Sequence, residues 1–228
     1  MAVEFDRYAA GYDQLLSDPI RDGFAADSAF FHWRKWLLIR DFFSRHGMET
    51  RSMRWLDVGC GRGELLHLGG STFGEAIGCD PAVEMTRSAN VRAIYQPRAT
   101  ELPFESDGFD FLTAVCVYHH VNAQDRPLLT AEISRVLRPG GFAAIIEHNP
   151  YNPVTRLIVS RTPVDAHAQL LCAASSRNLL QRSGLQIKET RYFLYLPQRL
   201  FALAGRAESL LSLVPFGGQY AVFARRER

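Results

Sequence analysis

Two pairs of side chains that can move protons each follow an apolar run of the sequence. His119 and His120 come directly after one run, and Glu147 and His148 come directly after another. If both runs are parallel strands, these residues meet at the carboxyl edge of a sheet, where ligands of such sheets bind. A histidine or carboxylate placed there can remove a proton from a reacting group, so we predict all four as candidate general bases. The alternative is that an imidazole packs against a bound molecule or bonds to a loop carbonyl, while Glu147 and His148 order the following loop.

A second chemical signal is the alternation of Gly59, Gly61 and Gly63 between an apolar stretch and a stretch with helical spacing. Glycine lets the backbone turn tightly and approach a ligand closely. The spacing G-x-G-x-G differs from G-x-G-x-x-G, the pattern that sets a pyrophosphate against helix amides. We therefore expect a ligand without a phosphate in this loop, which disfavours a nicotinamide oxidoreductase.

An acid, Asp80, stands about 20 residues beyond the glycine loop and ends the next apolar run. A carboxylate at that position can accept hydrogen bonds from both ribose hydroxyls of an adenosine. The loop and the acid together predict a ligand that contains adenosine.

These residues resemble the motifs of the class I S-adenosylmethionine-dependent methyltransferases. The letters L-D-V-G-C-G-R-G match that family's first motif, and Asp80 stands where its ribose-binding acid lies. The likeness covers about residues 5–147 and continues through residues 101–104, 108–110, 118–121 and 135–141. It implies that S-adenosyl-L-methionine is the cofactor and that its methyl group passes to oxygen, nitrogen or carbon of a small molecule. The cofactor contacts that it implies are Tyr12, Asp57, Gly59, Cys60, Gly61, Asp80, Pro81, Ala99, Thr100, Cys116 and Val117.

Residues 147–156, with the motif E-H-N-P-Y-N-P, and residues 217–220 resemble a bacterial small-molecule subfamily often associated with glycan or secondary-metabolite pathways. One position departs from the wider family pattern. Many members carry an acid near the adenine amine, and Arg98 holds that place here. The backbone of Ala99 or the side chain of Thr100 is expected to serve instead.

Short apolar runs alternate with stretches of helical spacing from about residue 53 onward. This order predicts βαβ units, and so a doubly wound, Rossmann-like α/β fold with a mostly parallel seven-stranded sheet and helices on both faces. Strands are expected at residues 53–58, 76–79, 91–95, 109–117, 142–146, 185–194 and 219–224, the last two forming an antiparallel edge. Helices are expected at residues 30–43, 64–68, 82–89, 123–137, 175–182 and 199–213.

We expect a single domain over residues 1–228, with an N-terminal helical cover at about residues 1–50 and a substrate cap at about residues 149–174. Tyr8 and Tyr12 lie in the cover, where they either close the reaction chamber or pack as ordinary aromatic residues. Residues 149–172, with the aromatic residues at 30–36, form the expected acceptor pocket, since long connections over this edge of a sheet usually carry specificity.

The remaining histidines, His32, His46, His67 and His167, are interpreted as surface or packing residues, with a smaller expectation of function for His167 in the cap. Cys116 is interpreted as a small core residue rather than a nucleophile.

Composition excludes several classes of partner. The 26 basic and 24 acidic residues give a net charge of +2, so we expect no nucleic-acid partner. No apolar run reaches the length of about 20 residues that a bilayer span requires, although residues 199–213 leave open a helix lying on a membrane surface.

Four scattered cysteines without a C-x-x-C pair predict neither a zinc site nor disulfides, and we expect no metal. With no apolar leader in residues 1–12, a cytoplasmic location is expected, and a homodimer stays open.

Two other functions stay open. A protein can keep the cofactor fold and work as a binding subunit without catalysis. A nucleic-acid methyltransferase is less favoured, because the letters N-P-Y at residues 149–151 resemble the N-P-P-Y motif of base-amine methyltransferases but follow the wrong strand.

Overall fold

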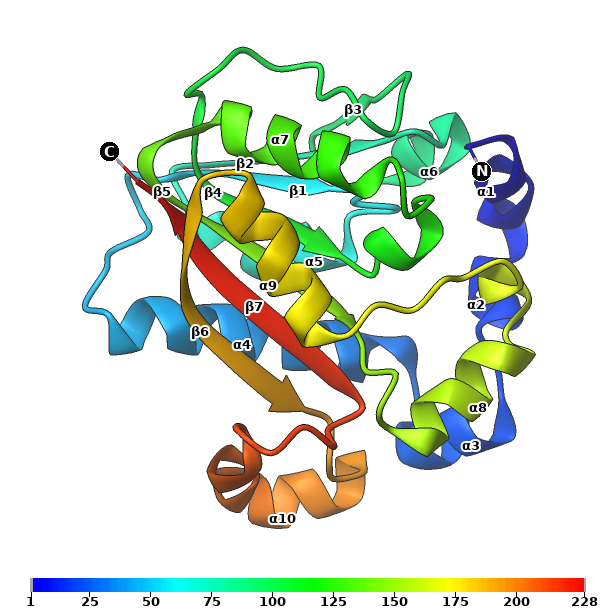
Figure 1. Cartoon of the computed structure of the whole chain (residues 1–228). Helices are drawn as coiled ribbons and strands as arrows, with labels where there is room; N and C mark the ends of the chain where they lie inside the picture. Colours follow the sequence, from blue (N-terminus) through cyan, green and yellow to red (C-terminus); the bar gives the residue numbers. More distant parts are fainter. Residues whose placement is uncertain (1, 228) are drawn as a thin grey trace.

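The computed structural model describes residues 2–227, and its strands form one seven-stranded sheet (Figure 1). The spatial order is β3-β2-β1-β4-β5-β7-β6, in which β7 runs antiparallel to both neighbours and the other pairs are parallel. The strands are β1 Arg54–Val58, β2 Glu75–Asp80, β3 Ala93–Tyr95, β4 Phe109–Val115, β5 Leu137–His148, β6 Leu185–Phe193 and β7 Gln219–Arg226. The predicted doubly wound, mostly parallel sheet is confirmed.

Helices cover both faces of this sheet, with α7 and α9 on one face and α4 and α5 on the other (Figure 1). The α-helices are α1 Ala2–Tyr8, α2 Tyr12–Leu15, α3 Pro19–Phe24, α4 Ser28–Arg45, α5 Glu64–Gly69, α6 Val83–Ser88, α7 Arg126–Val136, α8 Pro153–Arg161, α9 Ala173–Arg182 and α10 Gln198–Glu208. Short 3-10 turns are η1 Ala9–Gly11, η2 Gly70–Thr72, η3 Tyr118–His120, η4 Pro163–Asp165 and η5 Ser209–Leu211. None of the helices described in residues 2–227 is long and apolar enough to cross a membrane.

The apolar stripe of each long helix holds it against the sheet. On α4, Ile39 and Phe42 are fully buried, and the ring of Phe42 stacks on that of Phe223 in β7 at a centroid distance of 4.2 Å. On the opposite face, Leu129 of α7 and Leu180 of α9 are equally buried. Each such side chain contributes about 1.5–3 kcal/mol of burial free energy, so the two helix layers fix the sheet from both sides.

Side-chain caps start the helices that reach the site. The Asp27 carboxylate accepts a hydrogen bond from the Phe30 amide at 3.2 Å at the start of α4. The Asn152 side chain accepts one from the Thr155 amide at 2.9 Å at the start of α8, where Pro153 occupies the first turn. Caps of this kind satisfy backbone donors that the helix leaves free, so they determine where α4 and α8 begin.

Some boundaries differ from the sequence-based expectations. Helix α7 covers Arg126–Val136 rather than residues 123–137, and residues 138–141 belong to β5, which begins at Leu137 because that residue pairs with Phe109 of β4. The predicted antiparallel edge of the last two strands is confirmed, and β7 also pairs antiparallel with β5. The helix predicted at residues 199–213 bends at Ala204, where the backbone leaves helical geometry, and ends at Glu208.

Candidate active site

One cavity of about 530 Å³ lies over the carboxyl ends of β1, β2, β4 and β5. Its walls come from the glycine loop, from the residues that follow β4 and β5, from α4 and from the segment of residues 149–172. The predicted residues that line it are Tyr12, Asp57, Gly59, Cys60, Gly61, Asp80, Pro81, Ala99, Cys116, Val117, His119, His120 and His148. A single cavity therefore joins the predicted cofactor residues to the predicted bases.

The glycine loop forms a backbone cradle at the end of β1. Gly59 and Gly61 have φ of +67° and +55°, a region that glycine adopts without strain. The Gly59 amide donates to the Cys79 carbonyl at 2.8 Å, and a Cβ on Gly59 would stand 2.5 Å from Cγ2 of Val117. At Gly61 no atom lies within 4 Å of the place a Cβ would take. Gly61 thus leaves open space at the cavity wall, which fits a ligand that presses closely on the backbone.

Asp80 is buried at the end of β2 and held there by two backbone amides. Its Oδ2 accepts a hydrogen bond from the Gly61 amide at 2.9 Å and its Oδ1 accepts one from the Ala82 amide at 2.8 Å. Burial raises the pKa of this carboxyl, although both amides act against that rise. The carboxylate is therefore fixed in direction and offers its remaining lone pairs to hydroxyl donors in the cavity.

Asp57, inside β1, is a second buried carboxyl at the cavity wall. Burial raises its pKa to about 7, while the Thr113 hydroxyl, which donates to it at 2.6 Å, favours the charged form. The hydroxyl is itself oriented by the indole N–H of Trp55 at 2.8 Å. Asp57 therefore titrates in the neutral range and is suited to meet a cationic group.

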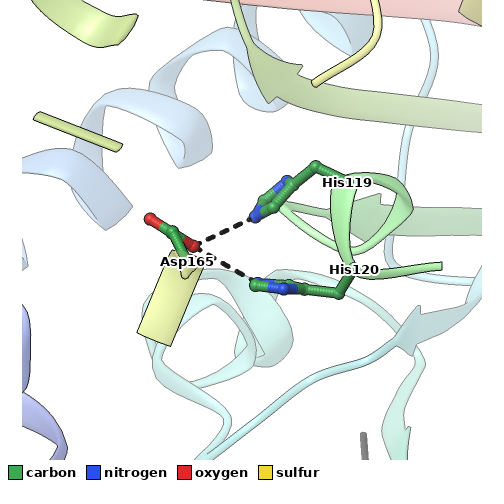
Figure 2. Close-up of side chains that lie close together, drawn as sticks. All are labelled: His119, His120 and Asp165. Atoms are coloured by element: carbon green, nitrogen blue, oxygen red, sulfur yellow. Dashed lines mark ion pairs between the residues drawn. The ribbon is translucent and has the colours of Figure 1, made fainter. Parts of the chain in front are cut away.

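The four predicted proton-moving residues do come together. Nδ1 of His119 lies 2.5 Å from the Glu147 carboxylate, whose other oxygen accepts the Tyr118 amide at 2.7 Å. Nε2 of His119 and Nε2 of His120 each lie 3.4 Å from one oxygen of Asp165 (Figure 2). The ring of His148 lies 5.1 Å from that of His119, measured between centroids. Residues from β5, from the turn after β4 and from the cap thus form one cluster.

Within this cluster the pKa values of His119 and His120 shift in opposite directions. Burial opposes a charge on His119, but the carboxylates of Glu147 and Asp165 outweigh it and raise the His119 pKa to about 10. Burial also opposes the charges of those two carboxylates, and the neighbouring histidines still hold their pKa values below the usual range. For His120, burial and the neighbouring His119 lower the pKa to about 3. The two carboxylates thus favour the charged form of His119, whereas burial favours the neutral form of His120.

Cys116 is half-buried just beyond β4 and lines the cavity, so its interpretation as a core residue is wrong. Its Sγ lies 3.6 Å from Nζ of Lys35 and 3.6 Å from Nε2 of Gln219, which in turn lies 3.4 Å from Nδ1 of His148. Burial raises the pKa of the thiol, but Lys35 and His148 outweigh it and bring the pKa down to about 7. The Cys116 thiol is thus a polar group in the cavity wall.

Two predicted catalytic residues stand behind the cavity wall. Glu147 is fully buried and reaches the cavity only through His119. The ring of Tyr8 contacts that of Phe5 at 5.8 Å, and Phe5, which lines the cavity, contacts the ring of His120 at 4.9 Å. Glu147 is therefore placed to position His119, and Tyr8 is placed to position Phe5.

The segment after β3 holds the residues that were expected to serve in place of an adenine-binding acid. Arg98 is exposed and pairs with Glu101 at 2.6 Å, whereas Ala99 lines the cavity and the neighbouring Thr100 does not. Sequence reasoning missed Gln96, a buried amide at the cavity wall whose Nε2 donates to the Arg98 carbonyl at 2.9 Å.

Several further polar residues of the cavity were missed, among them His32, Lys35 and Asp165. His32 and Lys35 of α4 both line it, and burial, with the nearby Lys35, lowers the pKa of His32 to about 3. The interpretation of His32 as a surface or packing residue is therefore wrong. The sequence signal that could have identified His32 and Lys35 is their spacing, since they are two polar residues one turn apart in a helix rich in aromatic side chains. Asp165 carried no comparable signal.

Residues 149–172, the expected acceptor segment, supply one wall of the cavity. Helix α8 and the turn after it contribute aliphatic and polar side chains in equal number, and Phe31 of α4 also lines the cavity. The lining residues from this segment are Asn152, Val154, Thr155, Ile158, Val159, Thr162, Val164 and Asp165.

Comparisons with known proteins agree with this geometry. Residues 56–145 match the family model described as a methyltransferase domain. This stretch, which runs from β1 into β5, is similar to that methyltransferase domain. The chain is also similar to a solved SAM-dependent methyltransferase structure from Thermotoga maritima. The superposition covers 99% of each chain, with a TM-score of 0.70 and 14% sequence identity. This likeness shows the fold.

Curated relatives of the methyltransferase domain act on different kinds of molecule. A 2-phytyl-1,4-naphtoquinone methyltransferase from Synechococcus elongatus is 34% identical over 139 residues, which are 53% of this chain and 59% of that protein. A tRNA (carboxymethyluridine(34)-5-O)-methyltransferase from Arabidopsis thaliana is 28% identical over 148 residues, which are 56% of this chain and 36% of that protein. The chain thus spans between about a third and three fifths of the length of these relatives.

Proposed function

We propose that this protein transfers the methyl group of S-adenosylmethionine to oxygen, nitrogen or carbon of a small molecule. The observation that carries the proposal is the continuous cavity. One end of this cavity has the glycine cradle and Asp80, and the other end has the histidine cluster beside the segment of residues 149–172.

At the cradle end, the residues present fit an adenosyl amino acid. We assign the ribose hydroxyls to the Asp80 carboxylate, which two amides already hold in place. Gly61 gives the amino-acid end room beside the backbone, and we assign its ammonium group to Asp57. Ala99 and Gln96 lie where the adenine would be received.

At the other end, the chain's task is to hold an acceptor in line and to take up its proton. Bound S-adenosylmethionine supplies an already activated methyl group. Positioning alone contributes about 7–11 kcal/mol to such a reaction, and a general base adds about 10²- to 10⁴-fold. We assign the base to His148, which lines the cavity beside Cys116, while His119, held by two carboxylates, positions the acceptor side.

The acceptor is small because α8 and the turn after it close over the cavity. We propose that residues 1–50 and 149–174 act as the cover and cap of a single catalytic domain. The naphthoquinone methyltransferase among the relatives fits an apolar acceptor. The tRNA methyltransferase among them keeps a nucleic-acid substrate as the second candidate, although the net charge of +2 gives little attraction to a phosphate backbone.

The test is transfer of a radiolabelled methyl group. The protein is incubated with [methyl-³H]S-adenosylmethionine and, in separate reactions, with a bacterial metabolite extract below about 3 kDa or with total tRNA. Label in the small-molecule fraction supports the proposal, and label in tRNA contradicts it. Tight cofactor binding without label in either fraction favours a non-catalytic binding subunit.

A further inference from the structure

Three metal-binding side chains converge beside the cavity. His119 and His120 both direct Nε2 toward the same carboxylate oxygen of Asp165, at 3.4 Å each (Figure 2). The three donor atoms lie within 4.8 Å of one another. In a tetrahedral zinc site with bonds of about 2.0–2.1 Å, neighbouring ligand atoms are about 3.3–3.4 Å apart. Both nitrogen-to-oxygen distances therefore match the spacing that one such ion imposes.

A carboxylate behind the cluster orients one of the candidate ligands. Nδ1 of His119 lies 2.5 Å from Glu147, which is fully buried and anchored by the Tyr118 amide at 2.7 Å. Histidines that bind metals almost always use their other ring nitrogen in this way, which fixes the ring and makes the ligating nitrogen more basic. Glu147 thus points Nε2 of His119 at Asp165.

The charge of the cluster also favours a cation. The Glu147 side chain is fully buried and that of Asp165 is 9% exposed. Within residues 2–227, the ion pairs of these two carboxylates are with histidines, and no lysine or arginine pairs with either of them. Buried charges are stable only when paired or bound to a metal. Without an ion, a proton on His119 balances these carboxylates, and a dication bound at Nε2 would take the place of that proton.

We propose that His119, His120 and Asp165 bind one divalent transition-metal ion, best matched by Zn²⁺, and that Glu147 orients His119 from behind. Two imidazoles and one carboxylate are the donor set of many catalytic metal sites, which keep a further position open. His120 and Asp165 both line the cavity, so the open position faces it. This departs from the expectation of no metal, which rested on cysteine spacing and had no means of linking Asp165 to residues 45 positions earlier.

The use of the ion, unlike its binding, rests on the proposed methyl transfer. A metal at this place would bind a hydroxyl or carboxylate oxygen of the acceptor and lower the pKa of a hydroxyl there. The proposal therefore favours acceptors that present oxygen.

The test measures metal binding to the full chain without cofactor or acceptor, so its outcome is independent of methyl transfer. Protein freed of metal by a chelator is titrated with ZnCl₂ by calorimetry, and with CoCl₂ while the visible spectrum is recorded. We expect one Zn²⁺ per chain, at least tenfold weaker binding in Asp165→Asn and in His120→Ala, and a smaller loss in Glu147→Gln. The control is His67→Ala, which removes an exposed histidine of α5 outside the cluster.

Circular dichroism and thermal unfolding establish that each variant is folded, and a Zn²⁺-dependent rise in Tm that only the wild type and His67→Ala show gives a second readout. Wild-type affinity that equals that of both Asp165→Asn and His120→Ala would overturn the proposal. So would a cobalt spectrum with thiolate charge-transfer bands, because it would place the ion on a cysteine.

Discussion

The two ends of the cavity are built in different ways. The cradle end uses backbone: a loop with three glycines at positive φ, hydrogen bonded through its amides to β2 and to one carboxylate. The acceptor end uses side chains, brought together from α4, from the turn after β4, from the end of β5 and from the cap. Substitutions at the cradle should therefore change ligand affinity, whereas substitutions at the acceptor end should change the chemistry and leave cofactor affinity nearly intact.

The largest effect that should distinguish the two ends of the cavity is expected at His148. We expect His148→Ala to lower the single-turnover rate of methyl transfer by about 10²- to 10⁴-fold, because a general base is lost. The affinity for S-adenosylhomocysteine should change by less than about threefold, since positioning of the cofactor does not use this side chain. Rapid-quench kinetics with the acceptor found by the radiolabel assay, and calorimetry, measure the two effects. An unchanged single-turnover rate would remove His148 from the role of base.

At the cradle, Asp80→Ala should weaken S-adenosylhomocysteine binding by at least about 100-fold. Hydrogen bonds to a charged group contribute about 1.5–3 kcal/mol each, and two hydroxyls would lose their acceptor. The matched control is Asp110→Ala, which removes another buried acid whose carboxylate accepts a backbone amide, that of Arg54 at 2.7 Å, at the opposite edge of the sheet. The control should lose stability and keep its affinity by calorimetry. Equal affinities for both variants would count against the ribose assignment.

A smaller effect is expected at Gly61, where a substitution only fills space in the cavity. Gly61→Ala places a methyl group in the cavity, and we expect about tenfold weaker S-adenosylhomocysteine binding. Gly47→Ala is the matched control, because Gly47 has φ of +62° and nothing within 4 Å of a Cβ, yet lies at the end of α4 outside the cavity lining. Both variants carry a similar backbone strain of about 1–2 kcal/mol, so their Tm values should fall alike. If affinity also falls alike, the ligand does not touch this glycine.

The smallest expected effect probes the boundary between the two ends. Lys35 lowers the pKa of the Cys116 thiol, so Lys35→Met should raise that pKa above about 7. At pH 7 alkylation of Cys116 by iodoacetamide should slow about threefold, because the thiolate becomes scarcer while its intrinsic reactivity rises. Mass spectrometry of the Cys116 peptide over pH 6–9 gives the midpoint, and Cys172 serves as the internal reference. An unshifted midpoint would mean that Lys35 does not control the thiol.

The same contrast explains what the sequence allowed us to predict. The glycine loop, Asp80 and the order of strands along the chain follow from contiguous motifs whose spacing has a direct geometric meaning, and the structure has the loop after β1 and Asp80 at the end of β2. The histidines after β4 and β5 were also found, because strand ends share an edge. Asp165 and Lys35 were not, since nothing local relates a cap turn or a helix residue to that edge; only the folded chain brings them together.

The most direct measurement of the central claim is a crystal structure of the protein with S-adenosylhomocysteine. We predict that its ribose hydroxyls bond to the Asp80 carboxylate, that its amino-acid end lies along Gly59 and Gly61, and that its sulfur points toward Cys116 and the histidine cluster. A ligand lodged elsewhere in the molecule, or a phosphate group found in the glycine loop, would contradict the account.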